Sequence, residues 1–415
     1  MPLIRPPMSA AVVQPLPGIG DMVWHLPHIR AIAAHLGVPV TLIAKPRSLA
    51  NQLLAHEPAV RDIMEIDLNP DHGRGRHDGI AGFVRLTREL RARRFDRIIL
   101  LHHSATIAAA AWLAGIPDRR GYGWGAQRLF LNHGPFPPKS VASLHQHTRA
   151  TIWLRDAGIP LASPEPSFPV TPEADAAARA KLAFNQPFIA MGIGSSETSR
   201  QSGPLRLAEI ASALIAAGWP KIVLIGGPGD AMLAEAIATA LSGSANEISW
   251  SGNATGTLGS GNANEISASG NATGALTGGN AAGTSASGNA TGALTGGNAI
   301  IAPGSRNTTG TSASGRVIIA LGWDMQQVAA VLRHAAFYVG NNTGVMNLAA
   351  AVGTRTYALF GTTPPFHHAS QIVPILSPPG GAPNGAARSA DDGMARVTTE
   401  MVLDAIRADR GSLRP

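Results

Sequence analysis

Apolar residues in the first half of the chain alternate between short runs and longer stretches with helical spacing. The stretch that ends at Leu36 places Val23, Leu26, Ile29 and Ile32 on one side of a helix. The pattern predicts strands at 11–16, 40–44, 62–66 and 97–101, and helices ending at 36 and spanning 82–93 and 105–114.

The second half repeats this alternation with different loops. Expected strands cover 188–191, 221–225, 317–320, 337–340 and 356–360, and expected helices cover 172–184, 205–217, 324–334 and 345–352. Regular alternation of strand and helix predicts parallel sheets with helices on both faces. The chain is therefore predicted to be an α/β protein with two Rossmann-like halves.

A low-complexity segment interrupts the second half. The sequence SASGNATGALTGGNA occurs at 267–281 and again at 285–299, so the repeat has a period of 18 residues. Gly, Ser, Asn, Ala and Thr offer few large apolar groups to offset the entropy of ordering, which predicts a disordered insertion. A repetitive β-solenoid is the alternative.

These segments predict the domain organisation of the 415 residues. A Pro-rich stretch at 161–172 is expected to link two domains, since prolines interrupt regular structure there. The expected parts are an N-terminal domain at 1–160, a C-terminal domain formed by 173–242 and 316–390, the repeat insertion at 243–315, and a C-terminal helix and tail at 391–415.

Composition narrows the class of protein. Hydrophobic residues make up 45% of the chain and charged residues 14%, and no apolar run approaches the roughly 20 residues that span a bilayer. No signal peptide is recognisable, so a cytoplasmic protein is expected. The chain has no cysteine, which excludes disulfides and thiolate metal sites.

The net charge of +7 arises mainly from arginine, and arginines cluster at 85–97 and 119–128. Each cluster is interpreted either as a solvated face or as an attraction for nucleic acid, anionic lipid or a phosphorylated substrate. Aromatic residues make up only 5% of the chain and do not alternate with the basic ones. We therefore expect no nucleic-acid partner.

Polar or glycine-rich loops follow three of the expected strands of the second half. They are 192–203, GGPGD at 226–230, and NNTG at 341–344, which precedes a helix of small residues. The N–H groups at the start of that helix predict an anion site, with Asn342, Thr343, Gly344 and Val345 around the anion. Ligands of parallel sheets lie at the carboxyl ends of the strands, so the three loops are expected to form one pocket.

Four motifs in order resemble one known family. They are GIGD at 18–21, a polar loop with a basic residue ahead of a helix at 195–211, GGPGD at 226–230, and the stretch from Gly340 to Gly353 followed by FGTTP at 360–364. Outside the repeats, the chain resembles glycosyltransferase family 9, the ADP-heptose:lipopolysaccharide heptosyltransferases.

The resemblance implies a GT-B fold, with two Rossmann-like domains facing across a cleft and the nucleotide sugar held by the second. It implies inverting transfer of a heptose or related sugar from a nucleotide sugar, ADP-heptose by the family pattern, to a lipid A–core or other envelope glycan acceptor at the inner membrane surface. It implies no metal and no cofactor. The protein is then expected in the cytoplasm, free or peripheral on the cytoplasmic face of the inner membrane.

The resemblance also implies roles for single residues. Asp21 matches the catalytic base, in a loop supported by Gly18 and Gly20, although an aspartate there also caps a helix. Arg200 matches a lysine that contacts phosphate, or else is a surface arginine. Ser195, Ser196 and Thr198 would donate nearby hydrogen bonds.

Two further sets of residues have open interpretations. Asp230 would bind the ribose or adenine side of the donor or cap a helix, and His102 with His103 would line the acceptor side or be structural. Asn342 and Asn347 stand where the family pattern has Asp and His, and Gln201 and Ser202 replace its Trp-Pro. The donor's identity is therefore left open.

Two other functions fit parts of the sequence. A non-catalytic relative would bind a nucleotide sugar without turnover. A Rossmann oxidoreductase is disfavoured because GIGD lacks the full G-x-G-x-x-G spacing.

Overall fold

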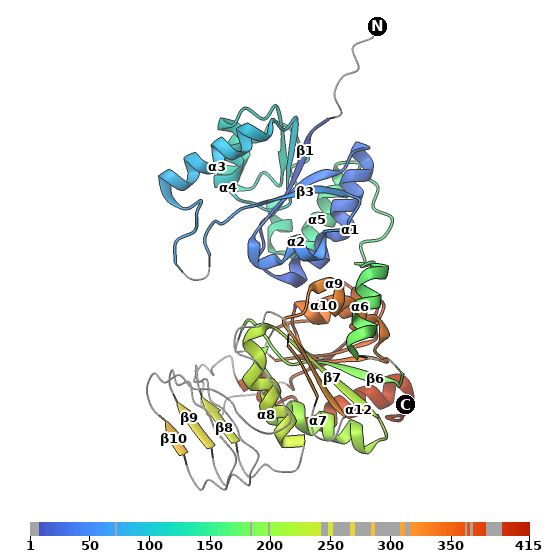
Figure 1. The fold of residues 1–415 in the computed structure, drawn as a ribbon. Coiled ribbons are helices and arrows are strands. Elements are labelled where there is room, and N and C mark those ends of the chain that lie inside the picture. The colour runs from blue at the N-terminus through green and yellow to red at the C-terminus, as the bar shows by residue number, and fades with distance from the viewer. Residues whose placement is uncertain are drawn as a thin grey trace. The chain divides into compact units, whose positions relative to one another are not determined.

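The computed structural model describes residues 8–70, 73–182, 185–197, 200–241, 248–251, 266–269, 284–286, 308–311, 316–361, 363–365, 368–378 and 392–415. It divides into two compact units (Figure 1). Unit 1 comprises 1–169 with 366–370, and unit 2 comprises 170–365 with 371–415.

Unit 1 is built on a parallel sheet of five strands in the order β3-β2-β1-β4-β5. The strands are β1 Ala10–Gln14, β2 Val40–Ala44, β3 Val60–Glu65, β4 Arg97–Leu100 and β5 Asp118–Gly121. The helices are α1 Ile19–Leu36, α2 Ala50–Leu53, α3 Gly79–Arg93, α4 Ala105–Leu113 and α5 Gln146–Asp156, with 3₁₀ turns η1 Pro46–Ser48, η2 Gly125–Phe130 and η3 Lys139–Ser143. This order confirms the predicted α/β alternation.

The two faces of this sheet are covered by different helices. Helices α3 and α4 pack together on one face, and α1 packs with α5 on the other (Figure 1). Ala11 and Val13 of β1 belong to the core on the α3 and α4 side, where Leu86 and Ile107 are fully buried or nearly so. Alternate residues of β1 point the other way, and the last of them, Gln14, meets α1.

Unit 2 has a seven-stranded sheet in the order β11-β12-β7-β6-β13-β14-β15, parallel except for β11. Its strands are β6 Phe188–Gly192, β7 Lys221–Gly226, β11 Thr308–Thr311, β12 Val317–Leu321, β13 Tyr338–Asn341, β14 Thr356–Phe360 and β15 Ile372–Leu376. Its helices are α6 Pro172–Leu182, α7 Pro204–Ala216, α8 Ala231–Leu241, α9 Met325–His334, α10 Gly344–Ala351, α11 Asp392–Ala395 and α12 Thr399–Arg410, with the 3₁₀ turn η5 Pro228–Asp230.

Helices again cover both faces of the sheet in unit 2. Helices α6, α9 and α10 form one layer, and α7, α8 and α12 form the other (Figure 1). The carboxyl ends of β6, β7 and β13 lie side by side at one edge, because these strands are near neighbours in the sheet. The three predicted loops therefore leave from the same edge.

Three short strands lie in the repeat segment and form a separate parallel sheet. They are β8 Ile248–Ser251, β9 Ile266–Ser269 and β10 Thr284–Ala286. Ile248 pairs with Ile266, and Ile266 pairs with Thr284. The offset equals the 18-residue period of the sequence, so equivalent repeat positions pair. The rest of the predicted disordered insertion, apart from β11, lies outside the described residues.

One segment differs from the predicted domain plan. Residues 366–370 fall inside the range expected for the C-terminal domain but cluster with unit 1. His368 accepts a hydrogen bond from the Trp24 indole, and Glu165 accepts bonds from the Ser370 N–H and hydroxyl at 2.6 and 2.7 Å. Hydrogen bonds between residues more than 200 positions apart leave no signal in local sequence patterns.

Candidate active site

The loop after β13 leads directly into α10. Thr343 is the N-cap residue in an extended conformation, and its side chain makes no capping hydrogen bond. Residues 342–345 are partly exposed, whereas Met346 is buried in the core. The first N–H groups of α10 therefore belong to partly exposed residues and have no side-chain cap from Thr343, which suits an anion.

Asn347 lies one turn into α10 and is buried. Its side-chain amide donates to the Thr343 carbonyl at 3.0 Å. The residue that replaces the family's histidine thus holds the first turn of its own helix.

Asn341 connects two of the loops. It is fully buried at the end of β13, and its side-chain amide donates to the Ile193 carbonyl at 2.7 Å. Its side-chain carbonyl accepts from the Ser202 N–H at 3.1 Å and from the Ser202 hydroxyl at 2.7 Å. This role was not predicted from the sequence, although a polar residue at the end of an apolar strand is a visible signal for it.

Close backbone approach accompanies these hydrogen bonds. A Cβ atom on Gly340 would lie 2.4 Å from the Gly192 carbonyl oxygen, which is too close for any side chain. Strands β13 and β6 therefore meet at a pair of glycines, and this contact fixes the spacing between their two loops.

The loop after β6 carries the predicted basic residue. The Arg200 guanidinium pairs with Glu197 at 3.0 Å, and both side chains are partly or fully exposed. Ser195 Oγ accepts from the Glu197 N–H at 3.2 Å, while Ser196 is exposed. Thr198 lies outside the described residues. An incoming anion must compete with Glu197 for Arg200.

Asp230 joins the loops after β6 and β7. Its carboxylate accepts from the Gly227 N–H at 2.7 Å, and a Cβ on Gly194 would lie 2.0 Å from its Oδ2. Burial raises the pKa of Asp230, although the Gly227 N–H acts in the opposite direction. The hydrogen bond supports the capping interpretation, and contact with a donor stays a prediction.

Asp21 is the third residue of α1 in unit 1 and is partly exposed. Its Oδ2 accepts from the Gly18 N–H at 3.1 Å, and a Cβ on Gly18 would lie 2.6 Å from this oxygen. Glycine at position 18 therefore lets the carboxylate close over the start of the helix. Gly20 is buried in the first turn.

His25 lies one turn after Asp21 and is fully buried. Its Nδ1 lies 2.7 Å from the Asp21 carbonyl oxygen and 3.2 Å from Gln14 Nε2. Burial lowers the pKa of His25 to about 4, so the ring is neutral at pH 7. Within the described residues its Nε2 has no hydrogen-bond partner.

A cluster of rings that the sequence analysis missed lies beside α1. The Trp24 ring has its centroid 4.5 Å from that of His145 and 5.0 Å from that of His368, and its N–H donates to His368 Nε2. Burial lowers the pKa of His145 to about 4 and that of His147 below its usual value. Accepting the Trp24 N–H requires His368 Nε2 to be unprotonated.

His102 and His103 follow β4 and stack with ring centroids 4.6 Å apart. Burial lowers the pKa of His102 to about 4, with His103 as the next cause. His103 is exposed. Their predicted position on the acceptor side stays a prediction.

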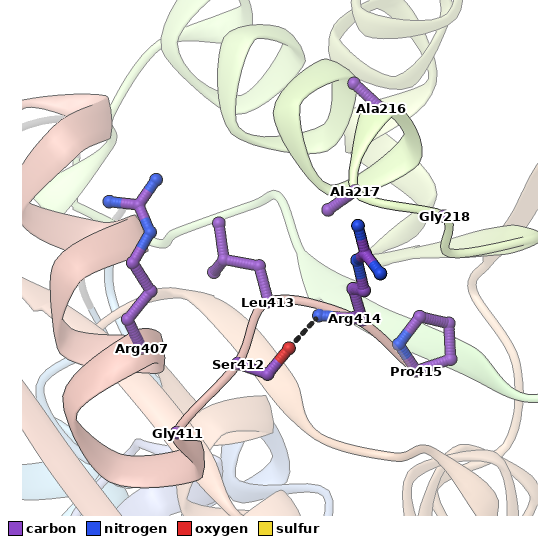
Figure 2. A pocket seen from close by; sticks show the side chains of 9 residues that line it. All are labelled: Ala216, Ala217, Gly218, Arg407, Gly411, Ser412, Leu413, Arg414 and Pro415. Atoms are coloured by element: carbon purple, nitrogen blue, oxygen red, sulfur yellow. Dashed lines mark hydrogen bonds between the residues drawn. The ribbon is translucent and has the colours of Figure 1, made fainter.

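A surface cavity of about 690 Å³ lies elsewhere in unit 2 (Figure 2). It is lined by the end of α7 and by the tail after α12, where Ser412 Oγ accepts from the Arg414 N–H at 2.9 Å. Its Arg407 pairs with Glu400 and Asp404. None of the predicted site residues lines this cavity.

In the described part of the chain, no helix is long and apolar enough to cross a bilayer. No group of three or more His, Asp or Glu side chains there could hold a metal ion.

Solved structures show the fold of this chain. The chain resembles E. coli ADP-heptose lipopolysaccharide heptosyltransferase II with a TM-score of 0.62 at 17% identity, covering 97% of this chain and 98% of the other. A family 9 glycosyltransferase from Veillonella parvula DSM 2008 matches with a TM-score of 0.65 at 15% identity, covering 98% of each chain. These likenesses show the GT-B glycosyltransferase fold.

The match extends to a third structure, E. coli heptosyltransferase WaaC with ADP-2-deoxy-2-fluoro heptose. Its TM-score is 0.58 at 15% identity, covering 97% of this chain and all of the other. The family model for glycosyltransferase family 9 (heptosyltransferase) matches residues 83–251 and 301–375, more than half of the chain. The chain belongs to this family, as the sequence motifs predicted. No curated protein sequence matches it.

Proposed function

We propose that this glycosyltransferase moves a heptose, by inversion and without a metal, from ADP-heptose to an acceptor of the lipopolysaccharide core. The observation that carries the proposal is the start of α10, where Thr343 leaves the first N–H groups uncapped and Asn341 holds the β6 and β13 loops together. A diphosphate is the anion that such a site suits.

The donor would lie along the three loops of unit 2. Asn342, Thr343, Gly344 and Val345 would surround the diphosphate with N–H groups at the positive end of the helix dipole. The donor site would be completed by five further residues: Ser195, Ser196, Thr198, Arg200 and Asp230. Binding would move Arg200 from Glu197 to phosphate, because a guanidinium binds two oxygens of an anion.

Asp21 would act as the base. The acceptor hydroxyl oxygen forms a bond to the anomeric carbon while its proton passes to the Asp21 carboxylate. The bond from the anomeric carbon to the diphosphate breaks, and the α10 N–H groups and Arg200 stabilise the charge that develops on the leaving oxygen. One displacement inverts the anomeric configuration.

The positive groups proposed around the leaving diphosphate support transfer without a metal ion. The α10 N–H groups and Arg200 offer the positive charge that a divalent cation supplies in other transferases. Full transfer in excess EDTA is expected, and a requirement for added Mg²⁺ or Mn²⁺ would contradict the proposal.

The protein would act in the cytoplasm or at the cytoplasmic face of the inner membrane, where a nucleotide sugar and a glycolipid acceptor meet. The family and the structures of its relatives with ADP ligands support ADP-heptose as donor. Asn342 and Asn347 are the positions at which another donor would be accommodated.

The test combines donor binding with transfer. Thermal shifts with ADP-, UDP- and GDP-sugars should show the largest stabilisation with ADP-heptose, since a ligand stabilises the state that binds it. NMR of the product from a core acceptor should show inverted anomeric configuration. A larger thermal shift with a UDP- or GDP-sugar would contradict ADP-heptose as the donor. Donor binding without turnover on any acceptor would contradict the transferase function and indicate a protein that only binds nucleotide sugars.

A further inference from the structure

Large apolar side chains are exposed on one part of unit 1. The described residues include eight exposed large apolar side chains, and five of them lie on α3, α4 and η2: Ile80, Val84, Trp112, Leu113 and Leu129. Ile80 is 86% exposed, Leu129 79% and Trp112 51%. Scattered apolar residues need no explanation, but a concentration on neighbouring elements indicates an interaction surface.

These three elements are in contact with one another. Helix α3 packs against α4, and α4 packs against η2. Arg91 of α3 donates to the Leu113 carbonyl at the end of α4, and the Trp112 ring lies 5.9 Å from that of Phe130 in η2. Helices α3 and α4 are seen together on one side of the unit 1 sheet in Figure 1.

The exposed side of α3 is apolar at its start and basic at its end. Ile80, Val84, Arg88 and Arg91 follow the spacing of a single helical stripe, so apolar side chains at its start continue into arginines at its end. Arg85, Arg94 and, on η2, Arg128 are also exposed. We call the five apolar residues and these five arginines the apolar–basic patch.

The charge of the patch is not neutralised by nearby acids. Among the described residues, none of its five arginines has a carboxylate within ion-pair distance. Glu89, the acidic residue of α3, lies 3.1 Å from His77, and Asp62 pairs with Arg93. Helix α4 has no charged residue, and Arg128 is the charged residue of η2.

We propose that the apolar–basic patch docks unit 1 on an anionic lipid surface. Indole and aliphatic side chains enter the interfacial region of a bilayer, and arginines beside them pair with acidic headgroups. A second copy of the chain fits less well, since a twofold contact would press the arginines against their own copies. Single-stranded nucleic acid also fits less well, because its bases stack on aromatic side chains. Trp112 is the one aromatic residue of the patch, and Ile, Val and Leu offer no stacking surface.

The test is co-sedimentation of the full chain with vesicles of phosphatidylcholine alone or with phosphatidylglycerol. Binding should require phosphatidylglycerol and weaken as salt is raised. Arg88→Glu should lower the partition coefficient roughly fivefold or more, and Leu129→Glu about tenfold. Arg414→Glu and Leu205→Glu, exposed positions of unit 2, are the matched controls and should bind as wild type.

Three results would overturn the proposal. They are no sedimentation of the wild type with anionic vesicles, equal binding to neutral and anionic vesicles, and wild-type binding by both patch variants. A dimer in analytical ultracentrifugation that Leu129→Glu dissolves would assign the patch to a second copy instead. The assay uses neither donor nor acceptor, so failure here leaves the proposed transfer reaction untouched.

Discussion

Both units place loops at the carboxyl edge of a parallel sheet, yet the two edges differ in chemistry. In unit 2 the loops are joined by neutral hydrogen bonds from Asn341 and by glycines that allow close backbone approach. In unit 1 the residues behind the α1 loop are titratable, with neutral, buried His25 under Asp21.

The difference matches the two tasks that we propose for the units. An anion site needs N–H groups held at fixed positions, and buried amide bonds hold them without adding charge. A base needs a carboxylate that stays ionised and reachable, and neutral histidines behind it add no competing charge. We therefore expect substitutions in unit 2 to change stability and donor affinity, and Asp21 substitutions to change turnover.

The largest effect is expected from Asp21→Asn. The amide oxygen still accepts the Gly18 N–H, so the start of α1 is retained, but the residue can no longer take a proton. Turnover should fall by roughly 10²–10⁴-fold with little change in donor affinity. Steady-state kinetics measures the turnover, and donor titration measures the affinity. Wild-type turnover in Asp21→Asn would show that Asp21 is not the base and would contradict the proposed difference between the units.

Asn341→Ala should destabilise unit 2 by about 3 kcal/mol. The substitution leaves the buried Ile193 carbonyl and the Ser202 groups without their partner. The matched control is Asn342→Ala, which is partly exposed and should cost about 0.5 kcal/mol or less. Denaturant unfolding of the two variants measures the difference, and equal stability would show that the β6 and β13 loops are held by other contacts.

Acid should destabilise unit 1 through His25. Its pKa is about 4 in the folded chain and about 6.5 when unfolded, so between these values the unfolded chain binds more protons. The stability contributed by the neutral ring is fully present above pH 6.5 and is lost as pH falls toward 4, by about 2 kcal/mol at pH 5.

Unfolding curves between pH 7 and 5 test this contribution. His25→Gln should show a shallower pH dependence than the wild type, whereas His103→Gln, at an exposed position, should keep the wild-type slope. An unchanged slope in His25→Gln would mean that other groups set the acid sensitivity of unit 1.

The smallest effect is expected from Arg200→Gln. Losing a charge-assisted contact to phosphate should weaken ADP binding about tenfold, and competition from Glu197 limits the loss. Arg206→Gln is the control, because Arg206 pairs with Glu209 on α7 and is not a predicted donor residue. Calorimetric titration with ADP measures the affinity of each variant. Equal affinity of Arg200→Gln and the wild type would mean that Arg200 is a surface arginine without a role in donor binding.

Local patterns predicted the fold well where apolar periodicity was strong. The helix after GIGD was expected to end at 36, and α1 ends at Leu36; the strand and helix around NNTG were expected and are β13 and α10. Patterns did not predict α5, the docking of residues 366–370 on unit 1, or the Trp24 and histidine cluster. The last two depend on residues far apart in the chain.

The sequence alone determined the α/β alternation, the family and the loops that carry the candidate residues, because strands, helices and glycine motifs are encoded by neighbouring residues. Tertiary structure decided which groups are buried together. Asn341 meets Ser202, His25 becomes neutral beside Asp21, and the neighbouring elements α3, α4 and η2 carry five of the eight exposed large apolar side chains of the described residues. Burial and electrostatic environment depend on what packs around a side chain, and periodicity records only which face of an element it occupies.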